Sequence, residues 1–471
     1  MAILGAAVLP HPPLVAGTVA KHGEKKLIEQ TINAYNTVAE TIAELKPQTI
    51  VLISPHTAFY ADYFHVSPSA RGELAYGDFS RFGDSKTCVE VKYDEIFIKI
   101  LSKRCRNDNF PCGTLGEREK DLDHGVTVPL YFVQKKYKDF KLVRLGLSSL
   151  PLSEHYELGM KIAELAVDLK TDVFVIASGD LSHKLLDEGP YGYAAEGPEY
   201  DAKVMKVLES AAFDELIHFD ERFLEKAAEC GHRSFCIMAG VFDGVKVKTE
   251  TLAYEGPFGV GYGSLLFEPT EKDKKRHFLE QHKKAERKRL NAKRSKESPY
   301  VQLARLAIET FVKKEELFNV SEYEKYNIPL GTEAFAEQAG CFVSLKKNGQ
   351  LRGCIGTIVS TKKNIAEEIV SNALSSACCD TRFQPVRPDE LTSLEYSVDI
   401  LFAPERIESE QELDVKRYGV IVSSGFKRGI LLPNLEGVDT VETQVAIAKR
   451  KAGILPHEKV TLERFEVVRY E

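Results

Sequence analysis

The sequence predicts a two-domain protein, with an α/β domain first and a smaller α+β domain after it. A chain of 471 residues is too long for one ordinary core, and this length favours two or three domains. Strand-like and helix-like segments alternate over residues 1–268, a basic segment covers 269–298, and a second unit covers 299–471. We therefore expect two folded domains joined by a linker.

The first domain is predicted from alternating apolar runs and helical patterns. Ile3–Val8 and Thr49–Ser54 are short apolar runs, and LIEQTINAYNTVAETIAEL between them has helical periodicity. KLVRLGLSSL, HYELGMKIAELAVDLK and DVFVIASGDLSH then predict strand, helix and strand. This order indicates a sheet flanked by helices, with ligands gathered at strand ends. The apolar start, MAILGAAVLPHPPLVAG, lacks a basic region and is expected to be a buried strand, not a signal peptide.

Charge and cysteine usage limit the class of protein. Residues 271–298 hold twelve Lys/Arg against five Asp/Glu, which favours a solvated helical linker, with phosphate or RNA binding as the alternative. A net charge of -7 argues against general attraction to nucleic acid. Nine scattered cysteines without a CxxC pair indicate reduced thiols and a cytoplasmic protein. No apolar run approaches the length of a membrane span.

Histidines follow several of the predicted strands. His11 in AAVLPHPPL and His56 in TIVLISPHT each come after a proline that ends strand pairing, and His183 ends FVIASGDLSH. His124, in DLDHGVTVPL, opens a predicted helix, and Asp121 and Asp123 are expected to favour its protonated form. Such strand-end histidines indicate an active site.

These motifs, in the order HPP, SPH, DHG and SGDLSH, resemble the LigB-like class III extradiol dioxygenases and their relative Memo over residues 1–268. The resemblance implies that His11 and His56 bind a non-heme Fe(II), that His183 is the acid/base and that His124 contacts the substrate or supports the site. Two neutral imidazoles and one anion hold a divalent ion while leaving positions open. Fe(II) is the expected metal, with Mn(II), Zn(II) or copper as alternatives.

The third ligand is expected within AAECGHRSF. The dioxygenase resemblance indicates Glu229, whereas the Memo resemblance indicates Cys230. A hard carboxylate oxygen suits Fe(II), which favours Glu229, although a thiolate near a helix start is also a competent ligand. The alternative for Glu229 is that it only faces the positive end of the helix dipole.

Two further interpretations concern the same region. Glu215 with His218, and Glu229 with His232, have the Glu-x-x-His spacing of di-iron helix bundles, but the α/β pattern disfavours such a bundle. His232 and Arg233 are instead expected to bind a substrate anion or to support the ligands.

The second unit begins with a helical pattern, VQLARLAIETFVK, followed by a hairpin-like CFVSLKKNGQLRGCIG. LRGCIG, CCDTRFQPV and GILLPNLEGVDTVETQVAIAKRKAGI resemble the AMMECR family over residues 299–471. Arg352 and Cys354 alternate along a strand and face one side, which suits an anion site beside a thiol. Cys354 as a buried filler is the alternative. Asp380 and Arg382 are expected to form an ion pair or to line the same cleft.

Three functional hypotheses follow. The first is a ring-opening dioxygenase of the EC 1.13.11 type acting on a catechol-like substrate. The second is a metal-binding protein without oxygenase activity, because fusion of the two units resembles the AmmeMemoRadiSam system, in which a radical SAM protein is the partner. The third is a metal-assisted hydrolase or lyase. The resemblance to oligomeric dioxygenases also suggests self-association.

Overall fold

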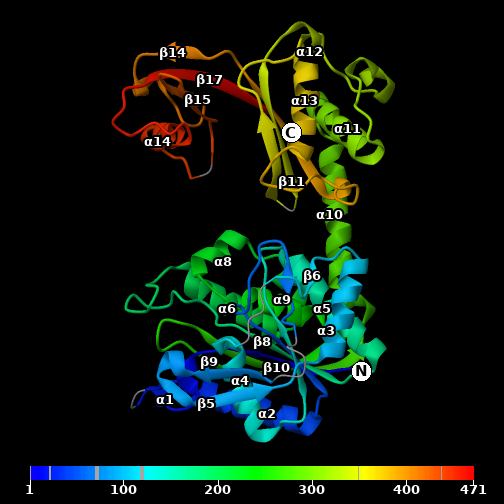
Figure 1. Cartoon of the computed structure of the whole chain (residues 1–471), viewed down its shortest axis with the longest axis vertical. Coiled ribbons are helices and arrows are strands. Elements are labelled where there is room, and N and C mark those ends of the chain that lie inside the picture. The colour runs from blue at the N-terminus through cyan, green and yellow to red at the C-terminus, as the bar shows by residue number, and fades with distance from the viewer. Residues whose placement is uncertain (1, 21–22, 69–73, 117–120, 348, 436) are drawn as a thin grey trace. The chain divides into compact units, whose positions relative to one another are not determined.

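The computed structural model describes residues 2–20, 23–68, 74–116, 121–347, 349–435 and 437–471. The chain divides into two compact units, Met1–Lys283 and Lys284–Glu471, here called the N-terminal and C-terminal units (Figure 1). The division falls inside helix α10 (Phe278–Arg294), so the basic segment is helical over most of its length. Strand β10 (Tyr262–Lys272) continues past residue 268 into this segment.

The N-terminal unit is built on a mixed sheet. Within the described residues, the strand order is β7-β2-β8-β1-β10-β9. The parallel strands are β1 (Ile3–Leu9), β2 (Thr49–Ile53), β7 (Lys141–Leu145) and β8 (Val173–Ser178). Strands β10 and β9 (Val245–Glu255) extend this sheet in antiparallel pairing. The α/β prediction is therefore confirmed.

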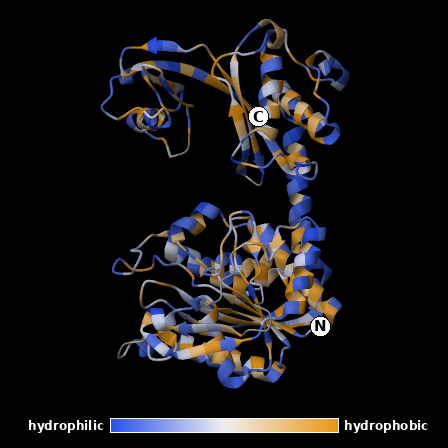
Figure 2. Cartoon of the chain, in the orientation of Figure 1, coloured by the Kyte–Doolittle hydropathy of each residue, from blue (hydrophilic) through white to orange (hydrophobic). Residues whose placement is uncertain are grey.

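Helices cover both faces of this sheet, as a mostly parallel sheet requires. On one side lie α2 (Glu29–Leu45) and α4 (His124–Lys136), which pack together. On the other lie α5 (Leu152–Leu169) and α9 (His232–Gly240), with α3 (Glu95–Asn107) against α5. Every residue of β2 and β8 is buried, and Figure 2 shows apolar residues concentrated along these strands.

The remaining elements of the N-terminal unit are shorter or lie at its edges. They are α1 (Glu24–Leu27), β3 (Phe64–His65), β4 (Ala75–Phe79), β5 (Asp84–Val91), β6 (Cys112–Gly113), α6 (Glu196–Glu209), α7 (Phe213–Leu216) and α8 (Glu221–Ala227). Helix α2 covers the helical pattern predicted between the first two strands, except for its first two residues, Leu27 and Ile28.

The C-terminal unit contains an antiparallel sheet in the order β12-β11-β13-β17-β15-β16 among its described residues. The strands are β11 (Gly340–Lys347), β12 (Gln350–Gly356), β13 (Leu394–Leu401), β14 (Glu405–Ile407), β15 (Tyr418–Ser424), β16 (Lys427–Leu431) and β17 (Thr461–Tyr470). Strand β17 pairs with β13 near its end and with β14 and β15 before that, so it joins both halves of the sheet.

The helices of the C-terminal unit are α11 (Pro299–Lys314), α12 (Glu333–Ala336), α13 (Ile365–Cys378) and α14 (Val441–Lys451). Helix α11 begins with a Ser298 cap and packs on α13, which in turn packs on β11. The predicted β11–β12 hairpin is present, with residue 348 of its turn outside the described residues. The α+β prediction is confirmed.

The basic helix α10 is less open to solvent than its composition suggested. Leu279 is 4% exposed and Leu290 is 6% exposed. Lys283 pairs with Glu157, and Lys293 pairs with Glu395, with N–O distances of 2.7 and 2.9 Å. Several cations of this helix therefore already have carboxylate partners. Among the helices of the described residues, none combines the length and apolar character needed to cross a bilayer.

Candidate metal centre

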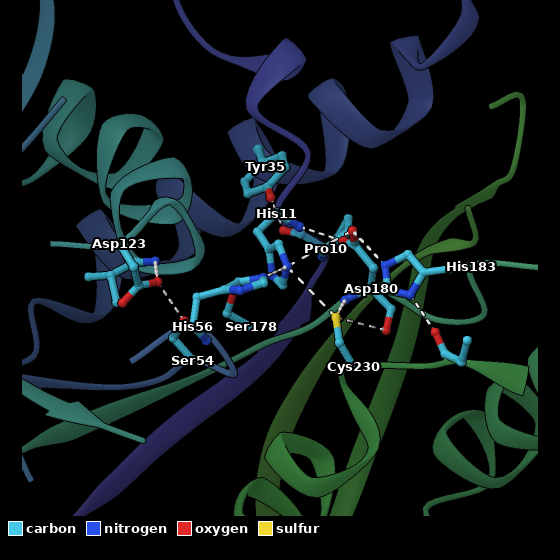
Figure 3. Close-up of polar contacts among 12 residues, drawn as sticks. Pro10, His11, Tyr35, Ser54, His56, Asp123, Ser178, Asp180, His183 and Cys230 are labelled. Carbon is cyan, nitrogen blue, oxygen red and sulfur yellow. Dashed lines mark hydrogen bonds and ion pairs between the residues drawn. The ribbon is translucent and has the colours of Figure 1, made fainter. Parts of the chain in front are cut away.

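Three of the predicted histidines meet at the carboxyl edge of the parallel strands. His11 follows β1, His56 follows β2 and His183 follows β8, and these strands are neighbours in the order β2-β8-β1. Because parallel strands end at the same edge, side chains far apart in sequence come together there. Figure 3 shows them converging with Cys230, which comes from the turn before α9.

His11, His56 and Cys230 form a group with metal-ligand spacing. The Nε2 atoms of the two histidines are 3.0 Å apart, and Cys230 Sγ is 3.7 Å from His11 Nε2. One ligand atom from each lies within 4.8 Å of the others. His11 is buried and His56 is exposed, so the group opens to solvent on the His56 side. A small molecule can reach such a centre.

Asp180, which we did not single out from the sequence, lies between two of the histidines. Its Oδ2 is 3.9 Å from His11 Nε2 and 3.8 Å from His183 Nε2, while its Oδ1 accepts a hydrogen bond from the His11 backbone. Asp180, His183 and Cys230 form a second group within 4.8 Å. The SGDLSH motif contained the signal, because a carboxylate in a strand-end turn faces the same edge as the histidine three residues later.

Hydrogen bonds on the far ring nitrogens fix two of the imidazoles. His11 Nδ1 is 3.0 Å from Ser178 Oγ, and His183 Nδ1 bonds to the Ala228 carbonyl. Such bonds set the ring orientation and leave Nε2 for a metal or a proton. Both Nε2 atoms face the Asp180 carboxylate (Figure 3).

His124 lies beside the other two rings, as the first residue of α4. Its ring centroid is 4.1 Å from that of His56 and 5.2 Å from that of His11. We expected Asp121 and Asp123 to favour its protonated form, and Asp123 does raise its pKa, but the net shift is in the opposite direction. Burial, and then His11, lower the pKa of His124 to about 4, and they outweigh the opposing effect of Asp123.

The other shifted pKa values follow from burial and charge. Desolvation, with His11 and His124 nearby, lowers the pKa of His56 below its usual value. Burial raises the pKa of the Cys230 thiol, and Asp180 raises it further. Burial opposes ionised Asp180, yet His11 and His183 hold its pKa below the usual range, and Asp180 in turn raises that of His183 against the effect of burial. A metal would bind the neutral imidazole of His56, and the Cys230 thiol would lose its proton on binding.

Glu229 is turned toward the start of α9. Its Oε2 accepts a hydrogen bond of 2.6 Å from the His232 backbone N–H, so the carboxylate satisfies a free helix N–H group. Burial raises the pKa of Glu229. Among the described residues, neither group with metal-ligand spacing contains Glu229. The geometry brings Cys230, and not Glu229, to the two histidines.

His232 and Arg233 do not have the surroundings that we expected of substrate-binding residues. His232 is fully buried, with Nε2 2.9 Å from the Leu216 carbonyl and Nδ1 3.3 Å from the Tyr200 hydroxyl. It has no open side for a substrate. Arg233 lies 3.7 Å from Glu221, which offsets its charge.

The di-iron interpretation receives no support from the described residues. His218 packs against the ring of His282 at 5.0 Å, and neither His218 nor Glu215 belongs to a group with metal-ligand spacing. The N-terminal unit is also built around a six-stranded sheet, and not as the helix bundle in which such a centre lies.

In the C-terminal unit, the four predicted surface residues do lie together, but both arginines among them are paired with carboxylates. Arg352 donates two hydrogen bonds to Glu390, of 3.0 and 2.9 Å. Arg382 donates to both oxygens of Asp380, and Asp380 also accepts from the Cys354 backbone. Arg382 lowers the pKa of Asp380. The anion site that we expected beside Cys354 is therefore occupied by the protein's own carboxylates.

Comparisons with known proteins divide the chain at the same place. Residues 5–264 match the family described as the catalytic LigB subunit of aromatic ring-opening dioxygenase, and residues 301–471 match AMMECR1. Protein CA_C1420 of Clostridium acetobutylicum is 38% identical over 479 residues, covering 100% of both chains. A Thermotoga maritima protein is 49% identical over 177 residues, covering 37% of this chain and 98% of its own.

A solved structure shares sequence with one part of the chain. The uncharacterized protein PH0010 from Pyrococcus horikoshii is 30% identical, and the match covers 36% of this chain and 88% of that one, with a TM-score of 0.32.

Proposed function

Because the chain belongs to the LigB family of aromatic ring-opening dioxygenases and carries an AMMECR1 domain after the LigB domain, we propose that its N-terminal unit is a metal-dependent enzyme. The proposed ligands are His11, His56 and Cys230. The single observation that carries this proposal is the convergence of their Nε2 and Sγ atoms at one open strand edge, beside a buried carboxylate and a further histidine.

The donor set fits a divalent ion. The two imidazoles, and the Cys230 sulfur once its thiol has lost its proton, would supply nitrogen and sulfur donors and leave positions for substrate oxygens. When bound, the metal would polarise two neighbouring oxygens of a substrate and, as iron, would also bring dioxygen to it. Fe(II) remains the proposed metal for ring opening, whereas the thiol makes zinc and copper the alternatives.

The protein's own residues would handle the protons. His183 lies on the Cys230 side of the centre, with Nε2 3.8 Å from the Asp180 carboxylate, which stabilises its protonated form. We assign His183 as the base that accepts a proton from a substrate hydroxyl. His124 lies beside His56 and is neutral at physiological pH. It can therefore accept or donate a hydrogen bond to the substrate without placing a positive charge next to the metal.

Cys230 supports a second candidate function. A thiol stands where the oxygenase resemblance implied a carboxylate, which favours metal binding without oxygen chemistry. In that case the chain would be a metal-binding member of a modification pathway that also contains a radical SAM protein.

One experiment separates these functions. The full chain is purified without oxygen, its metal content is measured, and oxygen uptake is followed with a panel of catechols and other vicinal diols. The first proposal expects one iron per chain and uptake with at least one diol. Stoichiometric metal without uptake or ring-opened product would favour the second, and a chain that binds no divalent metal would contradict both.

A further inference from the structure

A buried arginine is hydrogen-bonded to two loops of the candidate metal centre. Arg144 is in β7 and has no exposed surface, the largest side chain among the fully buried ones that the structure describes. Taking a guanidinium out of water is costly unless it is paired and its N–H groups have acceptors. The position of these acceptors therefore indicates what the residue does.

The guanidinium reaches two loops that carry histidines of the centre. Nε donates to Thr57 Oγ1 over 3.0 Å, in the loop of His56. Nη2 donates to Asp123 Oδ2 over 2.8 Å, and Nη1 donates to the Asp121 carbonyl over 3.1 Å, both in the segment that leads to His124. One rigid, planar group thus ties both loops to the sheet.

Asp123 completes the connection between the loops. Its Oδ1 accepts from Ser54 Oγ over 2.6 Å, and its Oδ2 accepts from Thr57 Oγ1 over 2.9 Å. Ser54 and Thr57 flank His56 in the sequence, so one carboxylate holds the chain on both sides of that histidine. Asp123 also accepts from the Val126 N–H and caps α4, which fixes the helix that begins with His124.

We infer that Arg144, acting through Asp123 and Thr57, is a positioning residue that sets the places of His56 and His124 in the metal centre. This inference rests on the proposed function, because it assumes that His56 is a ligand. A metal needs its ligand atoms within a few tenths of an ångström, and His56 lies on an exposed loop that strand pairing alone does not hold.

The arrangement differs from a purely structural ion pair. A buried pair can often be replaced by apolar residues of similar volume without loss of stability, so stability alone does not require arginine here. Thr57 is 2% exposed and takes part twice, as acceptor from Arg144 and as donor to Asp123. Its hydroxyl can be removed at nearly constant volume, which permits a sharp test.

The test is titration of the metal-free full chain with Co(II), followed by its visible spectrum, alongside thermal unfolding. We expect Thr57→Val and Arg144→Met to bind Co(II) about 10- to 100-fold more weakly, with an altered spectrum. Thr57→Ser, which restores the hydroxyl, should bind within about twofold of the wild type. Arg144→Met can fail to fold, and the two Thr57 variants keep the test decisive in that event.

Arg276→Met is the matched control. Arg276 lies in the same unit and donates to the Val245 and Ala211 carbonyls over 2.8 and 2.7 Å, and neither carbonyl belongs to the loops of His56 and His124. It should lower the melting temperature and leave Co(II) affinity unchanged. Equal affinity in Thr57→Val and wild type, or equal weakening in Arg276→Met, would overturn the inference. A wild-type chain that does not bind Co(II) would instead contradict the proposed function.

Discussion

The two units differ in how their clustered polar side chains are paired. In the N-terminal unit, His11, His56 and Cys230 converge with their nitrogen and sulfur atoms facing one another. In the C-terminal unit, Arg352 and Arg382 each meet a carboxylate of the chain itself. Both clusters contain residues that chemistry commonly uses.

The difference lies in which polar groups of each cluster remain available to an external ligand. Nitrogen and sulfur lone pairs that converge at an open edge favour an external cation. Guanidinium groups that already hold carboxylates have little attraction left for an external anion. A cluster is therefore a better candidate for a binding site when all its members are electron-pair donors that could bind the same cation. It is a poorer candidate when its charged groups already pair with one another.

The strongest test of this contrast is removal of one imidazole. His56→Ala should weaken Co(II) binding by at least about 1,000-fold, roughly 4 kcal/mol, because one of three proposed ligands is lost. His56 is exposed, so the melting temperature of the metal-free chain should change little. Arg352→Ala should leave the metal affinity unchanged. Full metal binding by His56→Ala would remove the contrast between the units.

A second test uses a carboxylate of the N-terminal unit that is satisfied internally. Asp201 is 1% exposed and accepts from the Ser182 N–H and the Tyr254 hydroxyl. Burial nevertheless raises its pKa to about 6. The folded state binds this proton more tightly than the unfolded chain does. The contribution of protonated Asp201 to the free energy of unfolding should therefore be lost as the pH rises from about 4 to 6. The loss is on the order of 3 kcal/mol.

Asp201→Asn should flatten that part of the stability curve, as measured by urea unfolding between pH 4 and 7. Metal affinity at pH 7 should be retained, since Asp201 is not among the proposed ligands. An unchanged pH dependence in the variant would show that another group is responsible.

A third, smaller effect is expected in the C-terminal unit. Glu390 is 6% exposed, so Glu390→Gln leaves the Arg352 guanidinium poorly paired and should cost about 2 kcal/mol in the free energy of unfolding. Asp389→Asn is the control, because Asp389 and Arg387 are largely exposed and their pair should contribute less than about 0.5 kcal/mol. Similar losses in both variants would mean that burial does not distinguish these pairs.

Much of the fold could be predicted from local patterns. The apolar runs at Ile3–Val8 and Thr49–Ser54 became β1 and β2, because short apolar runs between helical patterns fit buried parallel strands. Prolines before His11 and His56 marked where those strands end. The meeting of these histidines then followed from the rule that parallel strands end at one edge.

The remaining features depend on side-chain direction and on distant partners. Glu229 and Cys230 are adjacent, and only the backbone of the turn decides which one faces His11. The hardness of its oxygen atoms favoured Glu229 as the ligand. In the structure that carboxylate instead accepts a hydrogen bond from the His232 N–H at the start of α9. The role inferred for Arg144 depends on hydrogen bonds to Thr57 and Asp123, which lie far from it in the sequence. A single arginine in an apolar strand does not indicate which residues will be its partners.

The central claim is that a thiol and two imidazoles form the metal centre, and the adjacent residues Glu229 and Cys230 test it most directly. Cys230→Ala and Glu229→Gln are purified in parallel without oxygen, and bound metal per chain is measured. The glutamine keeps an oxygen that can accept the His232 N–H, so the start of α9 is preserved. We predict that Cys230→Ala loses its metal and Glu229→Gln retains it. Retention by Cys230→Ala together with loss in Glu229→Gln would contradict the account.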